Sequence, residues 1–306
     1  MGNSGTALVL GGTGFVGPHI VASLQADYLT TTVSRGVNSV GPEHISLDLS
    51  TDDPRPLTEL LRKYRPALVV NAAGSYWGLD ESGLHRSLVT LTETTLAALT
   101  ACSDLRPRYV HLGSVLEYGP LPASGRIDES TPTEPESLYG RTKLAASAAV
   151  QAAIARGSVD GVVLRVTNSI GPGVHPGTLI GRVGSMLAEH RAGRAHIELS
   201  PLAAYRDFID VRDLGAAVLA AARSRTARTV VNIGRGQAVS VRQLVDRLIS
   251  ISAVPADVVE SATAPGALGA VTSWLEVATG TAEQELGWRA TRSVDQALRD
   301  YWNTLA

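Results

Sequence analysis

The sequence predicts an α/β fold in which a doubly wound parallel sheet is joined to a smaller C-terminal lobe. In the first two-thirds of the chain, short apolar runs alternate with longer helical stretches. The runs are continuously apolar, which is typical of strands that are buried on both faces of a parallel sheet. A glycine-rich turn follows the first run. This βαβα order is the pattern of a doubly wound fold.

The individual elements follow from these runs. Strands are predicted at residues 7–10, 29–33, 67–71, 109–112 and 161–165, and a short one at 45–48. Helices are predicted at residues 15–24, 56–64, 84–102 and 139–156. Residues 171–177 contain three Gly and two Pro, which indicates a loop. Beyond it we expect helices at 179–191 and 214–224 and strands at 206–211 and 230–233. From about Gly234 onward we expect loop, with helices at 241–251 and 294–305.

Composition excludes several classes of protein. The 306 residues are 44% hydrophobic and 18% charged, enough to bury a sizeable core. A net charge of -2 with no basic tail argues against nucleic acid or membrane as partners. The sole cysteine, Cys102, fits a reducing compartment, and no signal peptide or apolar run of roughly 18 residues is evident, so we expect a cytoplasmic protein. The histidines show no metal-site spacing, so no metal is expected.

The glycine-rich turn is the first candidate binding site. Gly11, Gly14 and Gly17 lie where a strand becomes a helix, so that the backbone can approach a pyrophosphate closely. Pro18 falls in the first helical turn, where its missing N–H costs little. The turn is typical of a Rossmann dinucleotide-binding domain, and its predicted cofactor contacts are Gly11, Thr13, Gly14, Phe15, Val16 and Gly17. We therefore assign residues 1–165 to a dinucleotide-binding domain, to which the chain returns at about 207–234, and 166–306 mainly to a substrate-binding lobe.

The end of the second strand indicates which dinucleotide binds. NAD-binding versions commonly carry an acid about 20 residues past the glycines to hold the ribose 2′-OH. Here the strand ends in Ser34 and Arg35, and no acid is present. An arginine would neutralise a 2′-phosphate, with the serine as a second donor. The alternative is an arginine in a solvated loop. We predict NADP(H) in preference to NAD(H).

Two further segments are candidates for cofactor contacts. Asp48, at the end of the next short strand and followed by Leu49, could accept a hydrogen bond from the adenine amino group; alternatively it caps the following turn. Ala72, Ala73 and Gly74 place small residues where a cofactor would cross the edge of the sheet.

The acid–base residues come next along the chain. Tyr139 and Lys143 share one face of a helix, one turn apart. A nearby ammonium favours the phenolate, so we expect Lys143 to lower the pKa of Tyr139 from its ordinary value near 10. Ser114, after the fourth long strand, can donate a hydrogen bond to the same substrate oxygen. These three residues are the predicted catalytic set, and Tyr139 and Lys143 are also placed in the cofactor site.

The chain resembles the extended short-chain dehydrogenase/reductase family, the NAD-dependent epimerase/dehydratase group that acts on nucleotide sugars. The glycine turn, the Gly113-Ser114 to Tyr118-Gly119 segment and the Tyr139-Gly140-Arg141-Thr142-Lys143 helix carry the resemblance, with residues 164–172 and 206–213. The resemblance implies that Asn168 and Arg206 contact a substrate diphosphate. Without that contact, Arg206 would pair with Asp207 or Asp210. It also implies a homodimer formed through the helices at 84–102 and 139–156.

The residues beside Ser114 narrow the activity within the family. The dehydratases resemble Thr-Asp-Glu-Xaa-Tyr-Gly here, whereas this chain has Val115 and Leu116, which cannot move a proton. Glu117 is displaced by one position and would face the other way in a strand-like segment. Tyr76, Trp77 and Glu117 join Ser114, Asn168 and Arg206 as candidate substrate contacts, although Tyr76 and Trp77 could instead pack together on a loop.

The segment most resembles NADPH-dependent reductases of dTDP- or GDP-linked 4-keto-6-deoxyhexoses. In that mechanism a hydride reaches the sugar C4 and Tyr139 supplies the proton. Two alternatives stay open. One is a nucleotide-sugar C4 epimerase with bound NAD, and the other is a noncatalytic NADP-binding sensor or scaffold.

Overall fold

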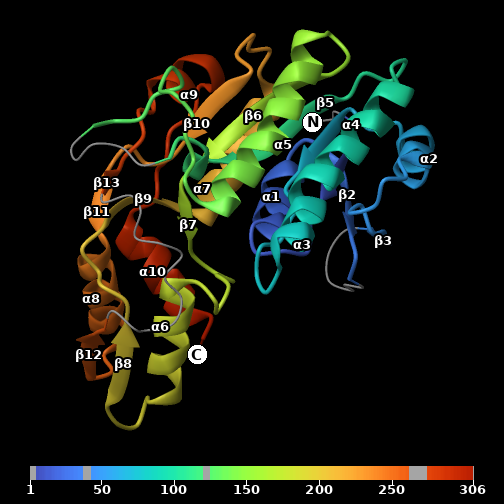
Figure 1. Ribbon diagram of the computed structural model, residues 1–306. Coiled ribbons are helices and arrows are strands. Elements are labelled where there is room, and N and C mark those ends of the chain that lie inside the picture. Colours follow the sequence, from blue (N-terminus) through green and yellow to red (C-terminus); the bar gives the residue numbers. More distant parts are fainter. Residues whose placement is uncertain (1–4, 37–42, 120–124, 262–273, 306) are drawn as a thin grey trace.

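The computed structural model describes residues 5–36, 43–119, 125–261 and 274–305. Within them, seven strands form one sheet in which every neighbouring pair is parallel, in the order β10-β6-β5-β4-β1-β2-β3 (Figure 1). The strands are β1 Thr6–Leu10, β2 Leu29–Ser34, β3 His44–Ser46, β4 Leu68–Asn71, β5 Arg108–Ser114, β6 Asp160–Val166 and β10 Val230–Ile233. The predicted doubly wound sheet is confirmed.

Helices cover both faces of this sheet, so its strands are buried on both sides. On one face α1 (Gly17–Leu24) and α7 (Val211–Arg223) pack on Ala7, Val9 and Val110. On the other, α2 (Arg55–Tyr64), α4 (Leu91–Ala101) and α5 (Leu138–Ala155) pack on Leu8 and Tyr109. Alternate residues of one strand thus enter different cores, which explains why strands such as β1 and β4 carry consecutive apolar residues and no alternation.

The helix predicted at 84–102 is a composite of three pieces. The structure has α3 (Glu81–His85), a π-helical turn (Arg86–Thr90) and then α4. The π turn lies against the loop after β4, where the Ser75 N–H donates to Ser87 Oγ at 2.8 Å. Such turns are rare and frequently occur at functional sites.

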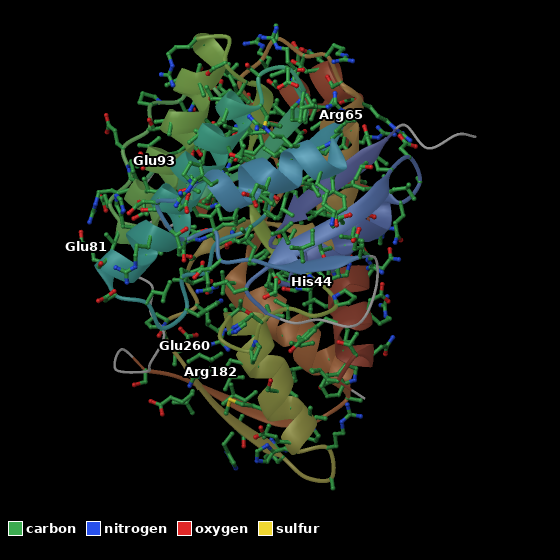
Figure 2. All side chains as sticks on the ribbon, turned by 90° about the vertical axis from the view of Figure 1, so that its right-hand side faces the viewer. His44, Arg65, Glu81, Glu93, Arg182 and Glu260 are labelled. Carbon is green, nitrogen blue, oxygen red and sulfur yellow. The ribbon has the colours of Figure 1, made fainter. Side chains whose placement is uncertain are left out.

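The rest of the chain forms a smaller part, which lies below the large sheet in both views and carries Arg182 and Glu260 (Figures 1 and 2). Strand β9 (Tyr205–Asp210) pairs with β7 (Asn168–Ile170), β11 (Ala238–Ser240) and β13 (Trp274–Leu275). Strands β8 (Ala195–Leu199) and β12 (Ala256–Glu260) form a parallel pair. Its helices are α6 (Leu179–Glu189), α8 (Val241–Ser252) and α10 (Val294–Asn303), and α9 (Gly280–Leu286) packs beside β10.

One expectation for this region was wrong. Loop and helix alone were predicted beyond Gly234, yet β11, β12 and β13 lie there. These strands have two to five residues and little apolar patterning, so their pairing partners define them more than their own sequence does. The strands predicted at 206–211 and 230–233 are present as β9, in the small sheet, and β10, in the large one.

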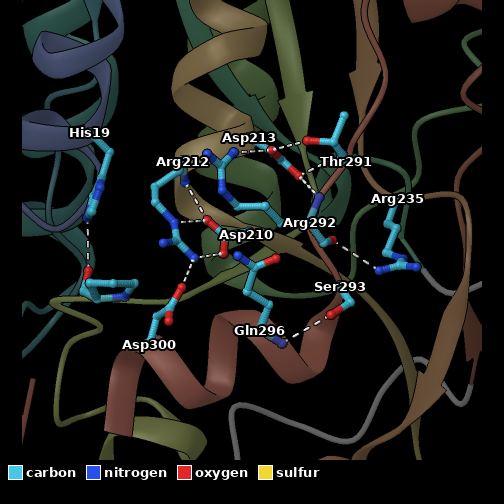
Figure 3. Close-up of polar contacts among 11 residues, drawn as sticks. His19, Asp210, Arg212, Asp213, Arg235, Thr291, Arg292, Ser293, Gln296 and Asp300 are labelled. Carbon is cyan, nitrogen blue, oxygen red and sulfur yellow. Dashed lines mark hydrogen bonds and ion pairs between the residues drawn. The ribbon is translucent and has the colours of Figure 1, made fainter. Parts of the chain in front are cut away.

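Ion pairs fasten the C-terminal segment to α7 (Figure 3). Asp213, which is buried, accepts hydrogen bonds from the backbone of Thr291 and Arg292 and pairs with the Arg292 guanidinium at 2.6 Å. Arg212 bridges Asp210 and Asp300, each at 2.6 Å. Because every oxygen of Asp213 has donors, its burial does not leave an unpaired charge.

In the described part of the chain, no helix combines the length and apolar character needed to cross a bilayer.

The close packing of the glycine turn gives a stability prediction. Gly17 and Gly280 are each the first residue of a helix, but a Cβ on Gly17 would lie 2.5 Å from Gly11 O, whereas one on Gly280 would have no neighbour within 4 Å. Gly17→Ala should therefore lower the free energy of unfolding by about 1–3 kcal/mol, as overpacking does. The matched Gly280→Ala should be neutral or stabilise by up to about 1 kcal/mol. Chemical denaturation measures both, and equal effects of the two substitutions would contradict the packing described here.

Candidate active site

The turns that follow β1, β2, β4 and β5 meet at one edge of the large sheet, because parallel strands all end on the same side. Most of the predicted site residues lie in these turns or in the first turns of α5. Two come from the smaller part of the molecule: Asn168 on β7 and Arg206 on β9.

The glycine turn has the shape that a pyrophosphate requires. Gly11 has φ +79°, and a Cβ there would lie 2.6 Å from the Ala73 backbone. Gly14 is exposed, and a Cβ there would lie 3.6 Å from its nearest neighbour, so the backbone is open to an approaching group. No side chain caps α1 at Val16. The first N–H groups of the helix are therefore available to an anion, and the residues present fit a dinucleotide.

The side chains of Phe15 and Val16 point away from this opening. Phe15 packs against the core of the smaller part, and Val16 against the core under α1 and α7. Any contact they make with a cofactor would come from their backbone.

The end of β2 is organised by hydroxyl groups. Thr13 Oγ1 donates to Ser34 Oγ at 2.9 Å, which ties the glycine turn to the second strand. Arg35 is exposed; its carbonyl accepts from Ser46 Oγ at 3.2 Å, and its guanidinium makes no ion pair with the described residues. A free guanidinium at this position can meet a phosphate.

Asp48 takes the capping role that was weighed against adenine binding. Its carboxylate accepts from Ser50 N at 2.9 Å and from Ser50 Oγ at 2.6 Å, and these hydrogen bonds lower the pKa of Asp48. It also lies two residues beyond the end of β3 and does not end that strand as predicted. Leu49 is buried in the core beneath α2.

Asn71 fixes the loop after β4, which carries Ala72, Ala73 and Gly74. Its Oδ1 accepts from Ala73 N at 3.1 Å, and its Nδ2 lies 3.2 Å from Tyr109 Oη. The alanines are half-buried, and Gly74 has φ +117°, a conformation that favours glycine.

Ser114, Tyr139 and Lys143 are brought together as predicted from the sequence. Ser114 ends β5 and caps a short 3₁₀ turn, Val115–Glu117. Ser137 caps α5 through Gly140 N, which places Tyr139 in the first helical turn. Lys143 is buried and its Nζ donates to the Leu112 carbonyl at 2.7 Å. Ser114 lies close enough to the Tyr139 phenol to act on its pKa, which it lowers.

The expected electrostatics of Tyr139 were wrong. Burial raises the pKa of Tyr139 above its ordinary value, the nearby Tyr76 and Glu117 raise it further, and only the Ser114 hydrogen bond lowers it. Burial also lowers the pKa of Lys143, which Glu117 opposes. Desolvation, and not the Lys143 ammonium that was expected to favour the phenolate, dominates the pKa of Tyr139. At neutral pH Tyr139 holds its proton and is suited to act as an acid.

Aromatic rings line the approach to Tyr139. The Tyr76 ring lies 5.0 Å from that of Tyr139 and 4.2 Å from that of Trp77, between centroids. Trp77 in turn stacks on His175 at 4.7 Å and 12°. Burial raises the pKa of Tyr76 to about 12. The pair packs on itself, and Tyr76 also flanks Tyr139; contact of the two rings with a substrate stays a prediction.

Arg206 does not form the ion pair weighed in the sequence. Asp207 accepts from the backbone of Arg235 and Gly236, and Asp210 pairs with Arg212. Arg206 is half-buried, and its Nη1 donates to the Tyr205 carbonyl at 2.8 Å. Burial lowers its pKa, so the charge lacks full solvation. Asn168, on the neighbouring strand, donates to the Asp207 carbonyl at 3.3 Å.

Glu117 is displaced from its predicted place among the substrate contacts. Its side chain is fully buried. The segment is a 3₁₀ turn and not strand-like, so the carboxylate turns back under Ser114. There it meets Ser147 of α5 and Arg165 of β6, two residues to which the sequence assigned no role. Their partner could not be inferred because the three residues are far apart in the chain.

No group of three or more histidine, cysteine or acidic side chains that could hold a metal ion occurs within the described residues.

Comparison with known proteins indicates the family of the chain. The model of the NAD dependent epimerase/dehydratase family matches residues 7–234. A protein of Kitasatospora kifunensis, dTDP-6-deoxy-L-talose 4-dehydrogenase (NAD(P)(+)), is 40% identical over 299 residues, covering 96% of this chain and 93% of its own. The structure of RMD from Pseudomonas aeruginosa complexed with NADPH shares the fold, with TM-score 0.83 at 24% identity, 100% of this chain and 99% of that one. MoeE5 in complex with UDP-glucuronic acid and NAD has TM-score 0.82 at 26% identity, with 98% of each chain covered.

The fold and the match define an NAD(P)-dependent oxidoreductase of the extended short-chain dehydrogenase/reductase type. The chain belongs to the NAD dependent epimerase/dehydratase family.

Proposed function

We propose that this protein is a reductase that converts a dTDP-linked 4-keto-6-deoxyhexose to the 4-hydroxy sugar with NADPH. The observation that carries the proposal is the half-buried, protonated Tyr139 near Ser114, with apolar residues where a dehydratase needs acids. Val115 is buried in an apolar cluster, and Leu116 packs against the same cluster. The site therefore has one proton donor next to the serine and lacks the acid pair that elimination requires.

Each residue of this site has a separate role in a carbonyl reduction. A nicotinamide cofactor in the glycine cradle supplies the hydride that the sugar C4 receives. Ser114 donates a hydrogen bond to the keto oxygen and orients it. Tyr139 transfers its phenolic proton to that oxygen as negative charge develops there, and the resulting tyrosinate is reprotonated from solvent. Lys143 helps to hold the cofactor and stabilises the tyrosinate.

We assign binding of the substrate diphosphate to the smaller part of the molecule. Arg206, half-buried and without an acidic partner among the described residues, is suited to clamp a diphosphate, with Asn168 beside it. Tyr76 and Trp77 offer ring faces to the sugar next to Tyr139.

The choice of dTDP over GDP rests on the 40% identical relative. The dehydrogenation named for that protein is, run in reverse, the reduction of a 4-keto-6-deoxy sugar. Its name admits both NAD and NADP, so the preference for NADP(H) depends on Arg35.

A homodimer is also proposed. On the outer face of α5, Leu144, Ala145 and Ala148 line an open hollow of about 530 Å³ together with Glu134, Pro135 and Arg141. Small apolar residues allow a second helix to approach closely, and a second copy of the chain is the proposed occupant.

The direct test mixes the purified protein with a dTDP-4-keto-6-deoxy sugar and follows the absorbance of NADPH. Oxidation of one NADPH per sugar reduced is expected, because the reaction consumes the cofactor stoichiometrically. No oxidation with dTDP- or GDP-linked substrates, together with interconversion of UDP-hexoses, would establish the epimerase instead. Cofactor binding without turnover of any sugar would favour the sensor.

Tyr139→Phe should lower kcat by about 100-fold or more, the range for removal of a general acid. Affinity for NADPH should change little, since the ring remains. Tyr28→Phe serves as the matched control, because Tyr28 is half-buried at the far side of the sheet near α7. Steady-state kinetics and NADPH fluorescence titration measure the two quantities. Wild-type turnover in the Tyr139 variant would require another proton donor.

Arg35→Ala should reduce the preference for NADPH over NADH, because it removes the charge that faces the 2′-phosphate. Arg62→Ala, at an exposed arginine of α2, is the matched control for the loss of one positive charge. Fluorescence titrations with both reduced cofactors give the ratio of dissociation constants. Identical ratios in the wild type and the Arg35 variant would rule out this role.

A further inference from the structure

Beneath Ser114 lies a buried cluster of charge that the proposed chemistry does not use. Glu117 Oε1 accepts from Ser114 N and from Ser147 Oγ, each at 2.8 Å. Glu117 Oε2 accepts from Arg165 Nε at 2.7 Å. The carboxylate is fully buried and Arg165 is 4% exposed. One side chain thus joins the turn after β5 to both β6 and α5.

Arg165 also contacts a second residue besides Glu117, the aromatic ring of Tyr118. Its guanidinium lies 4.4 Å from the centroid of the Tyr118 ring, and Tyr118 Oη donates to Asn232 Oδ1 of β10 at 2.8 Å. A buried ion pair pays a desolvation penalty and is weak evidence for added stability. This ion pair instead fixes the position of the Glu117 side chain. The residues that hold the pair lie on different strands of the sheet or on α5.

The cluster leaves little freedom to the Ser114 backbone. Ser114 caps the 3₁₀ turn through Leu116 N, and Glu117 closes the reciprocal hydrogen bond to Ser114 N. A Cβ on Gly113 would lie 2.7 Å from Glu117 Oε1, so the carboxylate fills the space directly beneath the strand end. Glu117 thus fixes the backbone of Ser114, and the hydrogen bond from Leu116 N fixes its hydroxyl oxygen.

We propose that Glu117, held by Arg165 and Ser147, is a positioning residue that orients Ser114 toward the substrate's keto oxygen and Tyr139. This inference rests on the proposed reductase function. It assigns to Glu117 an effect on the rate of the chemical step and none on the binding of the cofactor.

The charge of Glu117 adds a second, separable effect. Tyr139 is faced by Tyr76 from the loop after β4, by Ser114 from β5 and by Glu117 from the 3₁₀ turn, and Lys143 is faced by Glu117 and by His111 of β5. Glu117 raises the pKa of both Tyr139 and Lys143. Reduction needs both groups protonated, so removal of this charge lowers the pH at which the rate falls on the alkaline side.

The test is a double-mutant cycle between Glu117→Gln and Ser114→Ala, measured as kcat for the reduction with NADPH. Glu117→Gln should lower kcat by about tenfold, as small misplacements do, with an unchanged dissociation constant for NADPH. In the Ser114→Ala background the same substitution should have almost no further effect, because Glu117 acts through Ser114. The alkaline limb of the pH–rate profile should move to lower pH in Glu117→Gln and equally in the double variant, because the charge of Glu117 acts directly on Tyr139 and Lys143.

The matched control is Asp213→Asn, since Asp213 is also a buried carboxylate that accepts backbone hydrogen bonds and pairs with an arginine. It should lower stability without changing kcat. If Glu117→Gln does not fold, Ser147→Ala removes one hydrogen bond to the carboxylate and keeps the ion pair. It should lower kcat to a smaller extent and again only when Ser114 is present.

Losses of kcat that multiply in the double variant, or wild-type kcat in Glu117→Gln, would overturn the positioning role while leaving the reductase intact. A wild-type protein that oxidises no NADPH with any 4-keto sugar would instead overturn the proposed function and this inference with it.

Discussion

The parallel alignment of seven strands is the constraint on which the rest of this molecule depends. Because every strand of the large sheet runs the same way, the turns after β1, β2, β4 and β5 converge on one edge. The glycine turn, the Asn71 loop and Ser114 thereby become neighbours although they are spread over about a hundred residues. Covering both faces with helices also makes this edge the place where polar side chains can gather.

Burial then decides the chemistry of that edge. Tyr139 and Lys143 sit where water is scarce, so the neutral phenol is favoured and the ammonium is disfavoured. Glu117 offsets the cost for Lys143 and adds to the protection of the phenol proton. This desolvation keeps Tyr139 in the protonated form that a proton donor needs, although it also makes the phenol a weaker acid.

Much of the large sheet could be predicted, and much of the smaller part could not. Strand β10 was predicted at its observed bounds because three of its four residues, Val230, Val231 and Ile233, are β-branched and apolar. Strands β12 and β13 were not predicted, because their pairing with other strands, and not their own sequence, defines them as strands. Ser114, Tyr139 and Lys143 were found from their spacing on known elements. The displacement of Glu117 and the partners Ser147 and Arg165 were missed, since a 3₁₀ turn and contacts across 30 and 48 residues leave no local pattern.

The central claim is that the sugar receives a hydride at C4 while Tyr139 supplies the proton. The most direct measurement uses NADPH carrying deuterium at both positions of the nicotinamide C4, with a dTDP-4-keto-6-deoxy sugar, followed by mass and NMR analysis of the product. The account predicts one deuterium in the product, located at the sugar C4, and its loss from the cofactor. An unlabelled sugar product formed with the deuterium retained on the nicotinamide would contradict it.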